Sequence, residues 1–232
     1  MADLVVIVPS RGRPQATGEL GRVFQSTCSA DTQLVFAVDA DDRLVADYDA
    51  GRHPGDALII NDEQSTSTMV GTLNFAARRV LERIQPKAIA FMGDDHRPHT
   101  KGWDSAYLDA LAKLPGLVYG NDLVQGANLP TQVAMSTEVV RALGHMAPPP
   151  LTHLYVDNYW RDLGHATGCI TYLPDVVVEH LHPIVGKASW DEGYRRVNDE
   201  AMYEKDAAAY ATYWAQHGAG DVAAVRKAVA RG

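Results

Sequence analysis

The sequence has little cysteine and no long apolar run. Its two cysteines, Cys28 and Cys169, form neither a disulfide framework nor a zinc-type spacing, so we expect two free thiols. The apolar run at residues 4–8 is far shorter than the roughly 18 to 20 apolar residues of a membrane helix, and too short for a signal peptide. These absences predict a cytoplasmic protein with no membrane-spanning segment.

Positive charge is also in short supply. The chain carries 21 Lys and Arg against 29 Asp and Glu, which gives a formal net charge of −8 at pH 7. Because contacts to nucleic-acid phosphates need clustered basic residues, this balance argues against tight, sequence-independent binding to DNA or RNA. With 232 residues, 46% of them hydrophobic, the chain can bury one sizeable core, and we expect a single domain.

In the first half, short apolar runs alternate with segments of helical periodicity. The predicted strands are residues 4–8, 34–38, 58–60 and 88–92. Apolar residues at helical spacing follow the first strand, and a longer helix is predicted at 70–84. This alternation predicts an α/β fold with a doubly wound, mostly parallel sheet, in which ligands bind beyond the carboxyl ends of the strands.

The second half is less regular. Its predicted elements are helices at 107–114, 137–143 and 156–163, and strands at 117–119, 132–135, 170–172 and 176–178. We expect Thr137 to cap the second of these helices, Gly144 to end it, and Gly164 to end the third.

An alanine-rich tail that begins near Trp190 carries regularly spaced aromatic residues and is predicted to be helical. We divide the single domain into a nucleotide-binding half at 1–100, an acceptor and catalytic half at 101–187, and the helical tail at 188–232. The tail is expected to pack over the site or against a partner subunit of a homo-oligomer.

Polar residues follow each strand of the first half. They are Pro9-Ser10-Arg11, Asp39-Ala40-Asp41-Asp42, Asn61-Asp62 and Gly93-Asp94-Asp95-His96. Because the carboxyl ends of parallel strands share one edge of the sheet, we expect these side chains to form one site.

The last of these clusters carries the strongest chemical signal. Asp94, Asp95 and His96 follow a buried strand directly and offer consecutive ligands for a divalent cation. A cation held there would neutralise the charge that a nucleoside diphosphate gains as it leaves a sugar. The alternative is a solvated turn whose aspartates only cap a helix.

These motifs resemble those of GT-A fold glycosyltransferases, above all family 2 and the small phage-encoded transferases similar to it, over roughly residues 4 to 187. The resemblance implies a nucleotide-sugar donor, most commonly a uridine diphosphate sugar, and Mn²⁺ or Mg²⁺. It places Pro9, Ser10 and Arg11 near the donor base, Asp39 on uracil or ribose, and Asn74 on the helix before the metal strand.

Further basic residues are candidates for the donor phosphates. Arg11 and Arg13 are expected to hold phosphate or base, and Lys187 to lie in a flexible segment that covers the phosphates. The alternative for all three is a solvated loop.

Asp94-Asp95-His96 differs from a plain Asp-X-Asp motif, and two registers stay open. In the first, Asp94 contacts ribose and Asp95 binds the metal; in the second, Asp94 and His96 bind it together, as in the transferases that put N-acetylgalactosamine on proteins. The family often supplies a further histidine after the last core strand. Alternation puts His180 and His182 on one face of an extended segment, and we take His180 as the first choice for the ligand.

The resemblance also implies a catalytic base, an aspartate near the start of a helix over the acceptor cleft. Asp157 occupies such a place and could accept the proton of the acceptor hydroxyl, which implies inversion at the anomeric carbon. The alternative is that Asp157 only caps the helix. Trp103 is a candidate for contact with a donor or acceptor sugar, with core packing as the alternative, and His182 is a second acceptor-side candidate.

Two other classes compete with a glycosyltransferase. A sugar nucleotidyltransferase would usually open with a glycine-rich phosphate loop, whereas the loop after the first strand has a single glycine, Gly12. A non-catalytic carbohydrate- or nucleotide-binding protein on a degenerate transferase fold would lack the acidic edge, yet Asp39, Asp94 and Asp95 are present. The acceptor stays open among protein, modified DNA base, glycan and small molecule.

Overall fold

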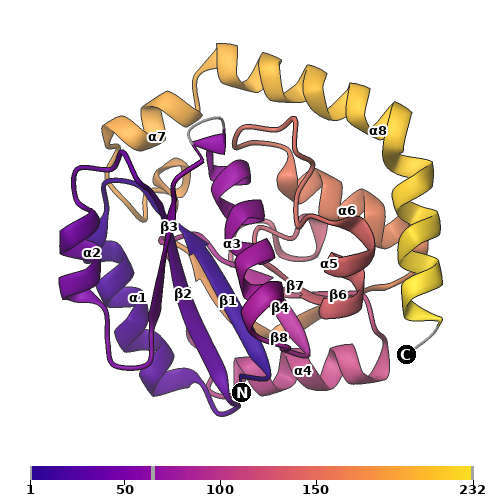
Figure 1. Cartoon of the computed structure of the whole chain (residues 1–232), viewed down its shortest axis with the longest axis horizontal. Helices are drawn as coiled ribbons and strands as arrows, with labels where there is room; N and C mark the ends of the chain where they lie inside the picture. Colours follow the sequence, from indigo (N-terminus) through magenta and orange to yellow (C-terminus); the bar gives the residue numbers. More distant parts are fainter. Residues whose placement is uncertain (1, 64–65, 231–232) are drawn as a thin grey trace.

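The computed structural model describes residues 2–63 and 66–230. One mixed sheet with the strand order β3-β2-β1-β4-β7-β6-β8-β5 forms its centre (Figure 1). The strands are β1 (Leu4–Pro9), β2 (Thr32–Asp39), β3 (Ala57–Asn61), β4 (Ala88–Phe91), β5 (His96–Pro98), β6 (Leu117–Asn121), β7 (Val133–Ser136) and β8 (Ile170–His180). The α-helices are α1 (Pro14–Thr27), α2 (Val45–Gly51), α3 (Met69–Arg83), α4 (Trp103–Lys113), α5 (Thr137–Leu143), α6 (Val156–Thr167), α7 (Glu192–Val197) and α8 (Glu200–Val229).

The sheet is parallel in its first half, as predicted. Strand β1 pairs in parallel with β2 and β4, and β2 pairs in parallel with β3. Strand β7 is antiparallel to both β4 and β6, while β6 and β8 run parallel. The short β5 pairs antiparallel with the end of β8. The carboxyl ends of β1, β2, β3 and β4 therefore lie along one edge, where the polar clusters follow.

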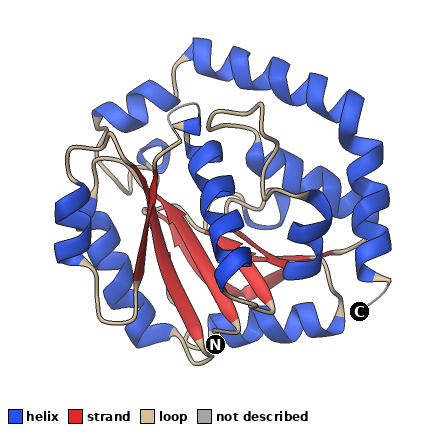
Figure 2. Ribbon diagram, viewed as in Figure 1, coloured by secondary structure: helices blue, strands red, loops and turns tan. Residues whose placement is uncertain are grey.

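Helices cover both faces of the sheet (Figure 2). Val5 and Ile7 of β1 face a core formed with α3, α5, α6 and α8. Leu4, Val6 and Val8 face the opposite core, which α1 and α4 close. Because both faces of β1 are buried, its sequence is a continuous apolar run instead of an alternating one.

Three local predictions need correction. The two strands expected at 170–172 and 176–178 form one strand, β8, with an irregular register opposite Gly120 and Asn121. Thr137 does not cap α5, because its hydroxyl donates to the Pro86 carbonyl at 2.7 Å. Gly164 does not end α6: the helix continues to Thr167, and Gly168, at φ 72°, is its C-cap.

The tail is helical, as predicted. Helix α8 is 30 residues long, which corresponds to roughly 45 Å, and it packs against α5 and α6. It curves along the outside of the molecule, whereas α7 lies near the carboxyl ends of the strands (Figure 1). None of the helices in the described part of the chain combines the length and apolar character needed to cross a bilayer.

Candidate functional site

The loop between β1 and α1 is held in place by a tyrosine of α2. The hydroxyl of Tyr48, a buried residue of α2, lies 3.0 Å from the Ser10 hydroxyl and accepts from the Arg13 N–H at 2.8 Å. The Gly12 N–H donates to the Asp42 carboxylate at 2.7 Å, and Gly12 has a positive φ of 73°, which suits glycine. These contacts hold the side chains of Ser10 and Arg13 at the sheet edge.

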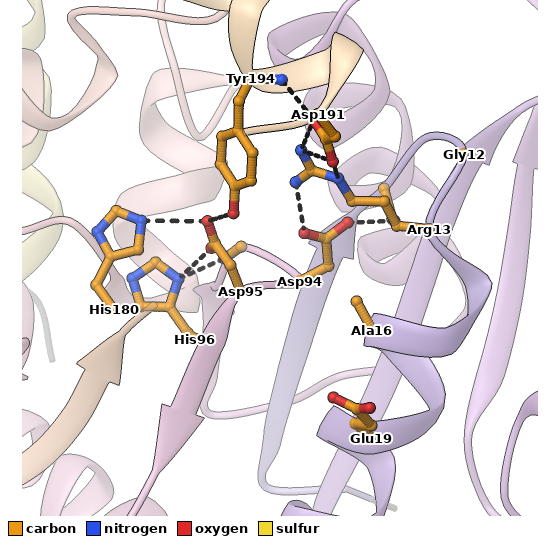
Figure 3. A network of polar contacts seen from close by, with 12 residues as sticks. Gly12, Arg13, Ala16, Glu19, Asp94, Asp95, His96, His180, Asp191 and Tyr194 are labelled. Atoms are coloured by element: carbon orange, nitrogen blue, oxygen red, sulfur yellow. Dashed lines mark hydrogen bonds and ion pairs between the residues drawn. The ribbon is translucent and has the colours of Figure 1, made fainter. Parts of the chain in front are cut away.

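The turn after β4 sends two adjacent carboxylates in different directions (Figure 3). Asp94 accepts from the Ser10 hydroxyl at 2.5 Å and pairs with Arg13 at 3.3 Å. Asp95 lies instead beside His96 and His180, each with a nitrogen 3.3 Å from its carboxylate.

A glycine is required in this turn. A Cβ atom at Gly93 would lie 2.5 Å from the Asp95 carboxylate and 3.0 Å from the His96 ring. The backbone N–H of Gly93 also donates to Nδ1 of His96 at 3.1 Å. Gly93 therefore lets the strand end, Asp95 and His96 pack closely together.

The pairing of β5 with β8 brings the two histidines together. His96 and His180 are register partners, and their rings stack with centroids 4.4 Å apart. One ligand atom from each of Asp95, His96 and His180 lies within 4.8 Å of the others. This is the set of side chains that could hold a cation.

Burial and neighbouring charges drive the pKa values of the two aspartates apart. Burial raises the pKa of Asp94 to about 6, assisted by the charge of Asp95 and opposed by Arg13 and Ser10. Burial acts the same way on Asp95, but the hydrogen bond from His180 outweighs it and, with the neighbouring His96, holds its pKa well below 3.8. Of the two carboxylates, Asp95 is therefore the one that ionises more readily.

The histidines also differ. Burial and the charge of His180 lower the pKa of His96. Burial lowers the pKa of His180 too, but its hydrogen bond to Asp95 and the Asp95 charge give a net rise. Burial and His180 lower the pKa of His182, whose ring lies edge-on to His180 at 5.1 Å.

The donor set fits a divalent cation, with a qualification at His96. Carboxylate and neutral imidazole are accepted ligands of Mn²⁺. Nδ1 of His96, the nitrogen next to Asp95, accepts the Gly93 N–H, and its buried Nε2 has no hydrogen-bond partner within the described residues. Asp95 and His180 can bind a metal without losing a backbone contact, whereas His96 would have to release Gly93 in order to bind through Nδ1.

Helix α7 lies over this cluster (Figure 3). Its residue Tyr194 contacts Asp95, and its N-cap residue Asp191 contacts Arg13, the partner of Asp94. The Tyr194 hydroxyl donates to Asp95 at 2.7 Å. Asp191 accepts two hydrogen bonds from the Arg13 guanidinium, at 2.9 and 2.8 Å, and the guanidinium lies 3.9 Å from the centre of the Tyr194 ring. The tail therefore packs over the site, which is one of the two places expected for it.

A second polar cluster follows β2 and β3. The Asp39 carboxylate accepts from Asn61 at 3.0 Å, from Thr72 at 2.5 Å and from Arg11 at 3.3 Å. Arg11 makes a further two-pronged pair with the exposed Asp41. Pro9 ends β1 beside this cluster, opposite Ala37 of β2. Charged and amide groups thus line the same sheet edge as the cluster of Asp95, His96 and His180, which is called the metal cluster below because it could hold a cation.

Asp157 lies in the first turn of α6, near His180. Its carboxylate accepts the Asn158 N–H at 2.9 Å and has no side-chain partner among the described residues. Burial raises its pKa, while the positive charges of Arg161 and His180 oppose the rise. A carboxylate with a raised pKa and free acceptor capacity suits proton transfer.

Three of the predicted site residues have other roles. Trp103 is fully buried, against Phe24 and Tyr107, so it belongs to the core and the predicted sugar contact is withdrawn. The Asn74 amide is occupied by the backbone of Met146 and Ala147, so this residue holds a loop and does not face a donor. Lys187 pairs with Glu179 at 2.8 Å instead of reaching Arg13 or the aspartates.

Sequence reasoning missed Asp191 and Tyr194 as site residues. The available signal was local: Asp191 precedes α7 and caps it by accepting the Tyr194 N–H at 2.8 Å. That pattern predicts a helix start but says nothing of Arg13 or Asp95, which lie about a hundred residues or more earlier in the chain.

No sequence-family profile matches the chain, and no curated protein is recognisably similar in sequence. Solved structures are similar in fold. The mannosyltransferase PcManGT from Pyrobaculum calidifontis, solved with GDP-Man and Mn²⁺, matches with a TM-score of 0.60 and 14% identity, over 99% of this chain and 74% of that chain.

TarS from S. aureus, residues 1–349 with UDP-GlcNAc, matches with a TM-score of 0.62 and 13% identity over 88% of this chain; this chain spans 64% of its length. Glucosyl-3-phosphoglycerate synthase from Mycobacterium tuberculosis, solved with Mn²⁺, UDP and phosphoglyceric acid, gives 0.56 and 12%, over 78% of this chain and 71% of that chain. At these identities the likeness establishes the fold, and the chain has the GT-A fold.

Proposed function

We propose that this GT-A chain is a metal-dependent glycosyltransferase that moves a sugar from a nucleoside diphosphate sugar to a hydroxyl acceptor. The first donor class to test is uridine diphosphate sugars. Guanosine diphosphate sugars come next, because one of the similar structures was solved with GDP-Man. The proposal places the reaction at the carboxyl edge of β1, β2 and β4.

One observation carries this proposal. Asp95, His96 and His180 converge within ligand distance of one another, beside an arginine, Arg13, that is anchored by Asp94 at 3.3 Å. A cation site next to a fixed guanidinium is an arrangement that binds a diphosphate. Two of the solved structures of similar fold are complexes with Mn²⁺ and GDP-Man or UDP, which supports a metal-dependent nucleotide site in this chain.

The residues have distinct proposed roles. Asp95 and His180 hold the cation, with His96 beside them. Bound there, Mn²⁺ or Mg²⁺ supplies Lewis-acid neutralisation of the diphosphate charge. Arg13 binds phosphate oxygens, Asp94 orients Arg13 and reaches the ribose, and the Asp39 and Arg11 cluster receives the base.

Asp157 is the proposed base. The acceptor oxygen bonds to the anomeric carbon as its proton passes to the Asp157 carboxylate, and the bond from that carbon to the diphosphate oxygen breaks. The electron pair of that bond leaves with the nucleoside diphosphate. Attack from the side opposite the leaving group inverts the anomeric carbon.

The decisive test is calorimetric titration with uridine diphosphate and guanosine diphosphate, with and without Mn²⁺. We expect binding that requires Mn²⁺ and is lost in Asp95→Ala and in His180→Ala. Asp49→Ala, which removes an exposed carboxylate of α2, is the matched control and should bind like the wild type. Release of nucleoside diphosphate from UDP-glucose, UDP-GlcNAc and GDP-mannose then tests turnover.

The outcomes separate the competing functions. Absence of binding to both nucleotides in the presence of Mn²⁺ would overturn the proposal. Metal-dependent binding without turnover of any donor, even with glycan, peptide and DNA acceptors supplied, would favour a binding protein on a degenerate transferase fold. Homo-oligomerisation through the outer face of α8 stays a prediction, which sedimentation of the same sample would check.

A further inference from the structure

A buried carboxylate of the C-terminal helix hydrogen-bonds the 152–154 loop, which leads to the proposed base. Asp206, in α8, is fully buried. It accepts the backbone N–H groups of Thr152 at 3.1 and 3.2 Å, of His153 at 2.8 Å and of Leu154 at 2.8 Å. Three consecutive peptide groups are thus bound to one side chain from a helix about fifty residues later.

The residue after this loop has a costly backbone conformation. Tyr155 has φ 65°, in the left-handed region, which is unfavourable for a residue other than glycine because the Cβ atom crowds the following carbonyl oxygen. Such a conformation persists only where surrounding contacts impose it. Two contacts flank it: the Asp206 hydrogen bonds on its N-terminal side, and the Tyr210 ring of α8, which stacks on the Tyr155 ring at 6.0 Å.

The orientation of Asp157 depends on this junction. Helix α6 begins at Val156, directly after Tyr155, so Asp157 lies in its first turn. The Asp157 carboxylate is bound only by the Asn158 N–H among the described residues. None of the described side chains hydrogen-bonds this carboxylate, so the backbone between residues 152 and 156 sets where it points.

We propose that Asp206 is a positioning residue of the site, which fixes the 152–154 loop and thereby aims the Asp157 carboxylate at the acceptor hydroxyl. This inference rests on the proposed function, because it assigns the loop a task in that reaction. It makes α8 part of the catalytic architecture and not only a cover for α5 and α6.

The structure provides a matched control for the ordinary stabilising effect of such a carboxylate. Asp104, in α4, is also fully buried and accepts backbone N–H groups, from Ser29 at 3.0 and 3.1 Å and from Ala30 at 2.9 Å. Within the described residues its hydrogen bonds go to Ser29, Ala30 and Thr32, and none goes to α6 or to the Asp95, His96 and His180 cluster. Asp104→Asn therefore removes a comparable charge without touching the junction.

The experiment compares Asp206→Asn with Asp104→Asn in the full chain. Asparagine keeps one acceptor oxygen but puts an amide N–H₂ against the Thr152 N–H, which loosens the loop. We expect the kcat for hydrolysis or transfer of the UDP-sugar donor to fall about tenfold to a hundredfold in Asp206→Asn, because small misplacements of a catalytic group have effects of this size. The donor KM and the affinity for UDP with Mn²⁺ should stay within about twofold.

Hydrogen exchange supplies a readout that does not need turnover. In Asp206→Asn, amides of the 152–158 segment should exchange faster, while those of β4 and β8 stay unchanged; in Asp104→Asn, the 152–158 segment should match the wild type. If Asp206→Asn fails to fold, Asp206→Glu serves instead. It keeps the charge and both acceptor oxygens but moves them one methylene further from α8, which displaces the N–H groups of residues 152–154.

The outcomes distinguish the inference from the function on which it rests. A wild-type chain that turns over no donor would overturn the proposed function, and the loop's role with it. An active wild type together with an Asp206→Asn variant of unchanged kcat, or with unchanged exchange at 152–158, would overturn the inference alone. Equal losses of kcat in Asp206→Asn and Asp104→Asn would show that Asp206 only stabilises the fold.

Discussion

Adjacent residues of identical type have opposite properties in this site. Burial raises the pKa of Asp94 although Ser10 and Arg13 oppose the rise, whereas contacts with His180 and His96 lower the pKa of Asp95 against its burial. The sequence motif predicts that both lie at the sheet edge. The difference between their pKa values depends on burial and on His180, which only the folded chain brings close. The proposed chemistry is therefore best tested by substituting one carboxylate at a time.

The first prediction concerns Asp157→Asn. Asparagine cannot accept a proton, so we expect donor turnover to fall by about a hundredfold or more, while the affinity for UDP with Mn²⁺ stays unchanged. In the wild type, kcat/KM should rise with pH as Asp157 loses its proton. Because burial raises its pKa, this rise should occur above the 3.8 of an ordinary aspartate. Steady-state kinetics across pH measure both effects.

The same variant should be more stable than the wild type at neutral pH. A carboxyl group whose pKa is raised on folding stabilises the fold below its unfolded pKa and loses that contribution as pH rises through the folded value. At neutral pH the buried charge of Asp157 therefore destabilises the folded state, and asparagine removes this charge. A lower urea midpoint for Asp157→Asn would contradict this assignment and indicate that the carboxylate caps α6.

How far the site was predictable is clearest from individual residues. Residues at or just beyond the end of a buried strand, such as Ser10, Asp39 and Asp95, are placed by the strand itself, so the sequence locates them. Trp103 and Asn74 looked equally suited to a site but face into the protein, because their own helices turn them inward. For Asn74 a signal was present, because it lies four residues after Val70 and three before Ala77, on the apolar face of its helix.

At the scale of elements, α7 competes with the proposed donor for Arg13. Asp191 holds the guanidinium with two hydrogen bonds, which a diphosphate would have to replace. We predict that Asp191→Asn binds UDP with Mn²⁺ up to about fivefold more tightly, as expected from losing a partly exposed ion pair. Asparagine still caps α7, so the helix itself should remain.

Asp199→Asn is the matched control for this effect. Asp199 caps α8 in the same way, by accepting the Met202 N–H at 2.7 Å, but has no contact with Arg13. Calorimetric titration of UDP into both variants should show tighter binding only for Asp191→Asn. Weaker binding in that variant would mean that Asp191 supports the donor site instead of competing for it.

Close packing between elements explains why Gly164 lies inside α6. An added Cβ would be 2.5 Å from Cβ of Ile170 in β8, so we predict that Gly164→Ala destabilises the protein by about 1 to 3 kcal/mol, despite alanine's better helix propensity. Gly220→Ala in α8, where nothing lies within 4 Å, should instead stabilise it. Urea unfolding measures both, and a gain in Gly164→Ala would refute the packing argument.

For the molecule as a whole, the tail connects regions that sequence analysis treats separately. Tyr194 contacts Asp95 at the metal cluster, and Asp206 contacts the loop before Asp157. The alternation of strands and helices predicts the sheet well, because each such element is encoded by its own periodicity. Contacts between residues a hundred positions apart have no such local signature, and they decide which parts of the tail belong to the site.

Docking of α8 onto the rest of the molecule should depend on pH. His145 lies 2.9 Å from the Tyr213 hydroxyl, and Tyr213 and Tyr159 both donate to Asp221. Burial lowers the pKa of His145; the charge of Asp221 opposes this and that of His217 assists it. A histidine with a lowered folded pKa contributes stability above its unfolded value, and this is lost as pH falls through the folded one.

We therefore predict that the wild-type free energy of unfolding falls as the pH drops below the 6.5 of an ordinary histidine. In His145→Gln this fall should be smaller, since glutamine can still hydrogen-bond Tyr213 but does not titrate. His165→Gln, at an exposed position of α6, should show the same fall in the free energy of unfolding as the wild type. Urea unfolding at several pH values compares the three proteins. If His145→Gln and the wild type lose stability in parallel, the acid sensitivity comes from other groups with a lowered pKa, such as His96, and α8 docking does not contribute to it.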